Sequence, residues 1–463
     1  MNVRNQRLGT ILFTTLAGCA SFSILEVLLP LYAKSALGFD ASGFSSLVSI
    51  QKIFLVPGIT MLPWLLRRMS STLLCGTALV VYGVCMPAMF LTHHATAFMP
   101  VYVLHSVACE YVFVALNALT QAVDPQSPAT PNTLYRLARA AASVMSPWVT
   151  ARVLANLGAE QVFRSLPLLM AGAMLGAGAL IRVYPLPEND VNVTTDDNAA
   201  VSTKADASDC ASVHKRAGGV RKKLICFVMS ASSALGGLGG VKLVCLMQIL
   251  GTTWVTVHTF IFFWVTEDLG HDVTYFSALK SATKLGSFLS ITLVGVGMKQ
   301  LGMKQTMLLC QVFSTVCMGL MAVSRTLGVY GYAGMCMATD AIPMISSIWV
   351  SRVALALRND SNSSLGGGGD VTGRKASAYA MKKVVGRAIN AAGLCVLGMV
   401  ARWAGNKQVV FGICSAVSLI GTLCFALTPP PPPLARAGAG GVADPVLFNR
   451  HSHLTPEEKK KEN

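Results

Sequence analysis

LGFDASGFSSLVS, residues 37–49, returns as LGHDVTYFSALKS at residues 269–281, which is 232 residues further along a chain of 463. Seven of the 13 positions are identical. In each copy a glycine ends a turn and an aspartate, Asp40 or Asp272, follows it. Aspartate oxygens at such positions accept the free N–H groups of a helix start. We therefore predict two equivalent helix caps and a chain built from two related halves.

The composition is that of a membrane protein. Hydrophobic residues make up 53% of the chain, charged residues only 13%, and the mean hydropathy is +0.56, whereas soluble domains carry about 25% charged residues. The apolar residues form twelve blocks, each close to the roughly 20 residues of a transmembrane helix. These blocks are 8–32, 44–66, 72–92, 98–120, 140–158, 162–184, 241–265, 276–297, 304–325, 328–351, 376–400 and 408–428. Because backbone groups in lipid must be satisfied within the span, the sequence predicts an all-α integral membrane protein with 12 transmembrane helices.

The repeat and the blocks together predict the domain organisation. Residues 1–184 form an N-terminal six-helix half and residues 241–428 a C-terminal six-helix half. Residues 185–240 form a cytosolic linker and interfacial lead-in, polar over residues 185–223, and residues 429–463 form a disordered cytosolic tail. The end of the linker, residues 224–240, is apolar but contains four glycines. We interpret it as an interfacial lead-in to the seventh helix, and an extra span is the alternative.

The distribution of basic residues predicts the orientation. With twelve spans, most of them fall on one side, which is expected to be cytosolic. They are Arg67, Arg68, Arg136, Arg139, Lys215 to Lys223, Lys299, Lys304 and Arg374 to Lys383. Both termini are then cytosolic, and the net charge of +16 faces anionic lipid. The scattered basic residues form no single nucleic-acid patch. Lys460 and Lys461 in the terminal KKEN resemble a dilysine retrieval signal, so plasma membrane and endoplasmic reticulum both stay open.

One further motif points to a family. The segment GVGMKQLGMK carries Gly295, Gly302 and Lys304 after the eighth block, with Lys299 at a position where an aspartate is expected. With the 6+6 plan, the long central loop and the repeated phrase, the chain resembles the major facilitator superfamily over residues 8–428. The resemblance implies two halves related by a pseudo-two-fold axis along the membrane normal, with substrate bound between them near the midplane. In the first half the signature keeps only Arg67 and Arg68.

Charged residues inside the blocks are the candidate functional groups, because a charge at a span centre costs roughly 2.5–3.5 kcal/mol and usually faces a cavity or a partner. The 232-residue offset aligns Glu26 with His258 and Lys52 with Lys284, and Glu110 lies close to Asp340 in the same alignment. We expect all six on the substrate or proton pathway: Glu26, Lys52, Glu110, His258, Lys284 and Asp340.

Their side chains suggest the roles. The carboxylates and His258 can take up protons near neutral pH, and Lys52 and Lys284 can neutralise carboxylates or hold an anionic substrate. The alternative is structural ion pairing, for example between Glu26 and Lys52. Lys280 is expected to extend towards the membrane surface.

Two arginines, Arg139 and Arg387, fall near the cytosolic ends of the fifth and eleventh blocks. We expect them to form an inner gate or to anchor helices to lipid phosphate. The thirteen cysteines show no metal-ligand spacing, and His93–His94 is the only suggestive histidine doublet. No catalytic residue, metal site or cofactor is therefore predicted, and we expect no enzymatic activity.

The leading hypothesis is a monomeric secondary active transporter of a small organic solute, working by alternating access and coupled to protons. An uncoupled facilitator, or a non-transporting sensor or scaffold on the same fold, is the alternative.

Overall fold

The computed structural model describes residues 3–123, 129–183, 238–339 and 371–428, with residues 342, 345, 346 and 349 between the last two ranges. All of them belong to one compact unit, Met1–Pro432. The candidate site residue Asp340, most of the linker and lead-in, and the tail lie outside the described residues.

The described part of the chain is helical and contains no strand. Its helices are α1 (Val3–Ser35), α2 (Ala41–Arg68), α3 (Ser71–Leu91), α4 (Ala95–Val123), α5 (Ala129–Leu157), α6 (Ala159–Val183), α9 (Leu238–Phe263), α10 (Val273–Gln300), α11 (Met303–Val323), α12 (Arg325–Thr339), α14 (Val371–Ala404) and α15 (Lys407–Ala426), with one π-helical segment, η1 (Trp264–Asp268). Each of the twelve predicted blocks overlaps one of these α-helices, so the all-α prediction is confirmed.

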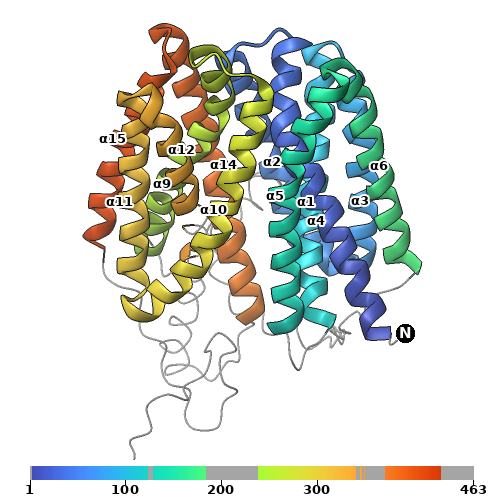
Figure 1. Ribbon diagram of the computed structural model, residues 1–463. Coiled ribbons are helices and arrows are strands. Elements are labelled where there is room, and N and C mark those ends of the chain that lie inside the picture. The colour runs from blue at the N-terminus through green and yellow to red at the C-terminus, as the bar shows by residue number, and fades with distance from the viewer. Residues whose placement is uncertain are drawn as a thin grey trace, which may run out of the picture. The chain divides into compact units, whose positions relative to one another are not determined.

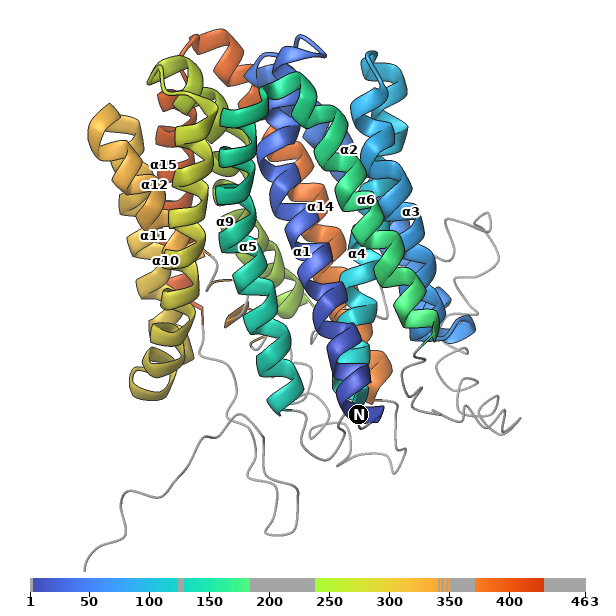
Figure 2. The same cartoon turned by 45° about the vertical axis from the view of Figure 1, so that its right-hand side comes forward.

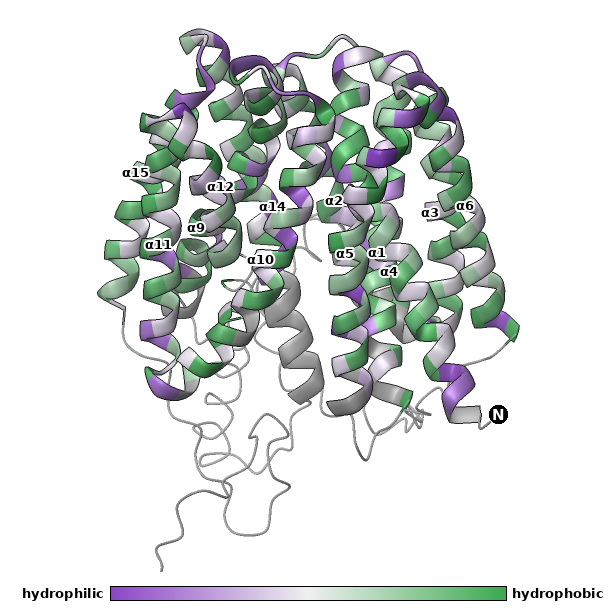
Figure 3. Cartoon of the chain, in the orientation of Figure 1, coloured by the Kyte–Doolittle hydropathy of each residue, from purple (hydrophilic) through white to green (hydrophobic). Residues whose placement is uncertain are grey.

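Ten of the helices are long and apolar enough to cross a membrane. The other two are α5 and α12. Helix α5 carries Arg136, Arg139 and Arg152, which lower its hydropathy, and the described part of α12 has only 15 residues. Apolar residues cover the middle of the helices and hydrophilic residues gather towards their ends (Figure 3). The chain is thus an integral multi-pass membrane protein.

The repeated phrase forms the two predicted caps. The Oδ1 atom of Asp40 accepts the N–H of Gly43 at 2.7 Å, and Oδ1 of Asp272 accepts the N–H of Tyr275 at 2.8 Å. Gly38 and Gly270 precede them with φ values of 69° and 71°, a left-handed conformation that glycine adopts without steric cost. The repeat therefore marks equivalent turns that start α2 and α10.

Short connections make the helices run up and down. Helices α1–α6 form one group and α9–α15 the other, and Figure 1 shows them on the right and left. The most extensive packing between the groups is that of α2 against α14 and of α5 against α10 (Figures 1 and 2). We call the end with the turns at Gly38 and Gly270 the upper end, and the end where α1 begins the lower end.

Packing of the apolar core differs between the two ends. Around the upper end, one cluster of buried residues draws on both groups, and Phe44 of α2 meets Phe263 of α9 with ring centroids 5.6 Å apart. Towards the lower end, the clusters formed by described residues are separate. One, with Tyr82 and Met174, belongs to the first group, and the other, with Met247 and Phe425, belongs to the second. The two halves therefore share a core at the upper end.

Candidate functional site

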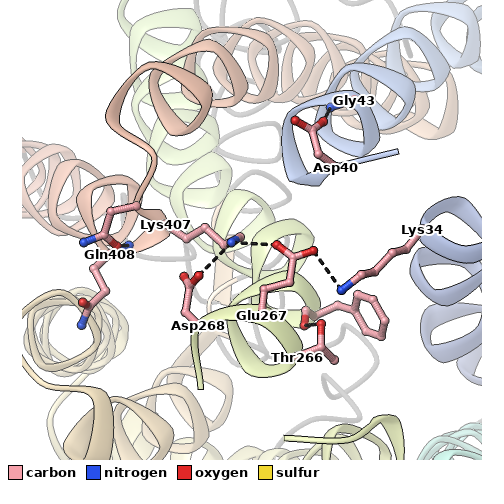
Figure 4. Close-up of polar contacts among 10 residues, drawn as sticks. Lys34, Asp40, Gly43, Thr266, Glu267, Asp268, Lys407 and Gln408 are labelled. Atoms are coloured by element: carbon pink, nitrogen blue, oxygen red, sulfur yellow. Dashed lines mark hydrogen bonds and ion pairs between the residues drawn. The ribbon is translucent and has the colours of Figure 1, made fainter. Parts of the chain in front are cut away.

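An ion-pair network connects the halves at the upper end. Lys34, in the last turn of α1, lies 3.0 Å from Glu267 of η1, and Lys407 of α15 lies 2.9 Å from both Glu267 and Asp268 (Figure 4). The π-helical segment presents Glu267 and Asp268 to these two lysines, and such segments are frequent at functional sites. Among the ion pairs that the described residues form in this network, only that of Lys34 with Glu267 joins the two halves, since Glu267, Asp268 and Lys407 belong to the same half.

Just below this network, α2 and α14 pack closely. The hydroxyls of Ser45 and Ser49 donate to the backbone carbonyls of Leu394 and Ala391, each at 2.6 Å. A Cβ added at Gly398 would lie 2.9 Å from Ser45 Oγ and 3.1 Å from Ser45 Cβ. The absence of a side chain at Gly398 therefore permits this contact.

The first mid-span charge cluster lies on α4 and α14. Glu110 of α4 contacts the guanidinium of Arg387 and lies 3.3 Å from Nζ of Lys383, both on α14. Glu110 stands 15 residues below the upper end of α4, which is about 22 Å at 1.5 Å per residue. The exposed fractions of the Glu110 and Arg387 side chains are 19% and 17%. A carboxylate of one half is thus held by two cations of the other half in the middle of the spans.

Lys52 stands 11 residues below the start of α2 at the upper end, which is about 16 Å at 1.5 Å per residue. Ser45, Ser49 and Lys52 are spaced four and three residues apart, so they lie on one face of α2, which the two serine hydrogen bonds direct at α14. Lys52 is half-buried and within electrostatic range of Arg387, Lys383 and Glu26. It forms no ion pair or hydrogen bond with any residue that the structure describes.

The second cluster joins α1 to α10. Lys284 Nζ of α10 lies 3.9 Å from Oε2 of Glu26 on α1, with exposed side-chain fractions of 24% and 26%. The suggested Glu26–Lys52 pair is wrong, because Lys284 of the opposite half takes that place. Glu26 Oε2 accepts no hydrogen bond from the described residues. This pair also crosses between the halves, and it is looser than the contacts of Glu110.

Polar and aromatic groups surround the second cluster. His258 of α9 lies with Nδ1 3.0 Å from the hydroxyl of Tyr332 on α12, and Trp254 packs edge-on against the imidazole. Nε1 of Trp254 is buried and has no acceptor among the described residues. The prediction that Lys280 extends towards the membrane surface is wrong. Its side chain is buried, with Nζ within 6 Å of the rings of Phe276 and Tyr332.

The two arginines of the predicted inner gate, Arg139 and Arg387, lie in different surroundings. Arg387 contacts Glu110 in mid-span, deeper than expected, because α14 begins at Val371 and leaves 16 residues below it. Arg139 of α5 is exposed, with its guanidinium 5.5 Å from the centre of the Phe113 ring. The structure therefore brings Arg387 into contact with Glu110 and leaves Arg139 outside that contact.

Several residues of the site were missed by sequence reasoning. Lys383 was counted with the cytosolic basic residues, although its spacing of four from Arg387 places both on one face of a helix. Lys34, Glu267 and Lys407 stand at helix ends, where charges are common. Nothing in the sequence marks them as partners, because they are far apart along the chain.

Comparisons with known proteins agree on the architecture. No family profile and no curated protein matches the chain. The solved structure of the nucleoside transporter NupG is similar at 15% identity and a TM-score of 0.66, covering 92% of this chain and 98% of that one. The peptide transporter POT, in complex with sulfate, is similar at 12% identity and a TM-score of 0.66, covering 91% and 94%. A bacterial homologue of the human lysosomal transporter Spinster, inward-facing and unoccupied, is similar at 10% identity and a TM-score of 0.61, covering 92% and 98%.

These likenesses identify the fold. The chain has the fold of major facilitator superfamily transporters, with two pseudo-symmetric six-helix halves. The resemblance read from the sequence is thereby confirmed at the level of the fold.

The upper network gives a first prediction. Changing Glu267 to glutamine removes the ionic link between Lys34 and the second half. Each partly exposed pair contributes up to about 1 kcal/mol, so we expect about a fivefold shift towards states with the upper end open. The shift is measured by the distance between spin labels at Ser35 and Arg402, both exposed, after replacement of the thirteen native cysteines.

Asp268→Asn is the matched control, because it breaks a contact between two groups of the same half. It should leave the distance distribution as in the wild type. Equal shifts in Glu267→Gln and Asp268→Asn would contradict a role for Glu267 in joining the halves.

Proposed function

We propose that the protein is a secondary active transporter that carries a small organic solute across a membrane by alternating access, coupled to protons. One observation carries the proposal: the mid-span ion pairs Glu110–Arg387 and Glu26–Lys284 each connect one half to the other. Charges in mid-span are costly and mark substrate and proton pathways. Because these ion pairs lie between the two halves, a movement of one half against the other changes the partners of their charged groups.

The structure suggests which step of the cycle it represents. At the upper end the Glu267 network, the Phe44–Phe263 contact and the serine hydrogen bonds of α2 hold the halves together. We propose that this end faces outward and the lower end faces the cytosol, as the basic residues predict. The state is then closed to the outside, and rocking of the halves must open these contacts to admit solute.

We base the proposed proton coupling on the same pairs. A carboxylate that loses its cation while the halves separate is left charged in a poorly solvated site, and taking up a proton relieves that cost. Glu26 is the better placed of the two, because its contact with Lys284 is 3.9 Å long while Glu110 is held by two cations. We propose that Glu26 takes up the coupling proton and that Glu110 controls the movement of α14.

The similar structures support transport as the activity. Those described above are transporters of nucleosides, of peptides, and a homologue of a lysosomal transporter. Their substrates differ, so the fold leaves the solute of this chain open. We further propose the two halves at residues 1–184 and 241–428, with residues 185–240 as linker and 429–463 as tail, in a monomer with both termini cytosolic.

Flux in proteoliposomes tests the coupling. For a solute that the wild type accumulates, an inward proton gradient should increase the initial rate several-fold. Glu26→Gln should lose this gradient-driven accumulation and keep solute exchange in the absence of a gradient, because exchange needs no net proton movement.

Other outcomes assign other functions. Flux that is identical with and without the gradient would replace proton coupling by facilitated diffusion. If gradient-driven accumulation survives in Glu26→Gln, the proton assignment to Glu26 is wrong. A folded protein that moves no solute would indicate a sensor or scaffold.

A further inference from the structure

Lys407 stands at a place where a lysine is unfavourable. It is the first residue of α15, and Asn406 caps that helix by accepting the N–H of Gln408 at 2.8 Å. The N-terminus of a helix carries a partial positive charge, which repels a cation. The side chain of Lys407 is also the least exposed of the four in the upper network, at 12%. An ammonium in such a place needs acidic partners close by.

Glu267 is one of those partners, and its two oxygens serve different helices. Oε2 lies 2.9 Å from Nζ of Lys407, and Oε1 lies 3.0 Å from Nζ of Lys34 on α1. Nζ of Lys407 also lies 2.9 Å from Oδ1 of Asp268 (Figure 4). Because Lys407 holds Oε2, the rotation of the Glu267 carboxylate is restricted and Oε1 stays directed at Lys34. Lys407 is thus placed to orient the contact between the halves, although both of these ion pairs of Lys407 lie within the second half.

A second contact, one turn further along α15, holds the same segment. Phe411 follows Lys407 by four residues and so lies on the same face of the helix, and its ring meets that of Trp264 edge-on with centroids 5.5 Å apart. Trp264 is the first residue of η1 and is fully buried. A Cβ added at Gly328 of α12 would lie 2.8 Å from the indole ring, so α12 also packs closely against it. Helix α15 therefore holds η1 at two points, Lys407 and Phe411.

We propose that Lys407 is a positioning residue of the upper contact: by holding one oxygen of Glu267 it directs the other to Lys34, and so stabilises the state in which the upper end is closed. This inference rests on the proposed alternating access and adds a control of it from α15. It also predicts a sign. If Lys407 competed with Lys34 for Glu267, removing Lys407 would strengthen the contact between the halves. If Lys407 orients Glu267, removing Lys407 weakens that contact.

Lys407→Met tests the sign, because it removes the charge and keeps a side chain of similar length. The distance between spin labels at Ser35 and Arg402 is measured in the purified full-length protein after replacement of the native cysteines. We expect a shift of about threefold towards states with the upper end open, less than for Glu267→Gln, because a misoriented Glu267 still attracts Lys34. Lys407→Arg should restore the wild-type distribution. Lys407→Gln serves the same test where Lys407→Met does not fold.

Two further variants separate positioning from a general loss of stability. When Lys407→Met is added to Glu267→Gln, it should cause no further shift, since Lys407 acts through Glu267. Lys304→Met is the matched control, because Nζ of Lys304 donates to the carbonyls of Ala426 and Thr428 at the other end of α15. It should leave the label distance as in the wild type, even where the melting temperature falls.

Four results would overturn the proposal. Lys407→Met leaves the label distance unchanged or shortens it, Lys407→Arg lengthens it as Lys407→Met does, Lys304→Met lengthens it equally, or the shifts of Lys407→Met and Glu267→Gln add. Flux in proteoliposomes separates this inference from the proposed function. The predicted distance shifts in a protein that moves no solute would support the role of Lys407 and overturn transport. Unchanged distances in a Lys407→Met protein that transports would overturn only the role of Lys407.

Discussion

Replacing Glu110 with glutamine is expected to abolish transport and to destabilise the protein by about 3 kcal/mol. The change leaves Arg387 and Lys383 without their carboxylate in mid-span, and removing one partner of a buried ion pair typically costs about 3–5 kcal/mol. We expect the lower end of this range because the side chains of Glu110 and Arg387 are not completely buried. The measurement is thermal or denaturant unfolding of the purified protein, together with flux in proteoliposomes.

A double-mutant cycle isolates the pair. Arg387→Gln combined with Glu110→Gln should be less destabilised than the sum of the single changes by at least about 1 kcal/mol, since residues in contact couple by about 0.5–3 kcal/mol. Glu160→Gln is the matched control. Glu160 also pairs with an arginine, Arg164, but one turn away on the exposed surface of α6, so its loss should change stability by no more than about 0.5 kcal/mol. Additive single changes in the Glu110 cycle would show that the pair is not a coupled unit.

Replacing Gly398 with leucine should drive the upper ends of the halves apart. A Cβ at this position already meets Ser45 at 2.9 Å and 3.1 Å, and overpacking costs about 1–3 kcal/mol. That cost is borne only while α2 and α14 are in contact, so the equilibrium should move about tenfold or more towards the open upper end. The distance between spin labels at Ser35 and Arg402 should lengthen, and flux should fall in parallel.

Gly172→Leu supplies the control for added bulk. A Cβ at Gly172 of α6 has no atom within 4 Å among its described surroundings, so the same substitution should leave the label distance unchanged. A wild-type distance distribution in Gly398→Leu would mean that the α2–α14 contact does not hold the upper end closed.

The sequence predicted the fold because its strongest signals are local. Apolar runs of the length of a membrane span identified the helices, and the repeated phrase identified equivalent turns with Asp40 and Asp272 as caps. The helix ends were less accurate. Helix α14 begins at Val371, five residues before the predicted block, because its first turns are polar and hydropathy does not detect a helix beyond the apolar segment.

The site was only partly predictable, because its partners are distant along the chain. The 232-residue offset aligned Lys52 with Lys284 and placed Glu26 at a related depth. It relates equivalent positions of the two halves and carries no information about which side chains face each other between them. The contact of Glu26 with Lys284, and that of Glu110 with Arg387 and Lys383, depend on how the halves pack, and only the structure shows them.

The measurement that tests alternating access most directly is flux through a protein whose upper end can be locked. Cysteines at positions 34 and 267, introduced as Lys34→Cys and Glu267→Cys after replacement of the native cysteines, are joined in proteoliposomes by a short, reducible thiol cross-linker. These positions lie on opposite halves, where the native side chains are 3.0 Å apart. We predict that transport stops on cross-linking and returns on reduction. Transport at an unchanged rate through the cross-linked protein would contradict the account.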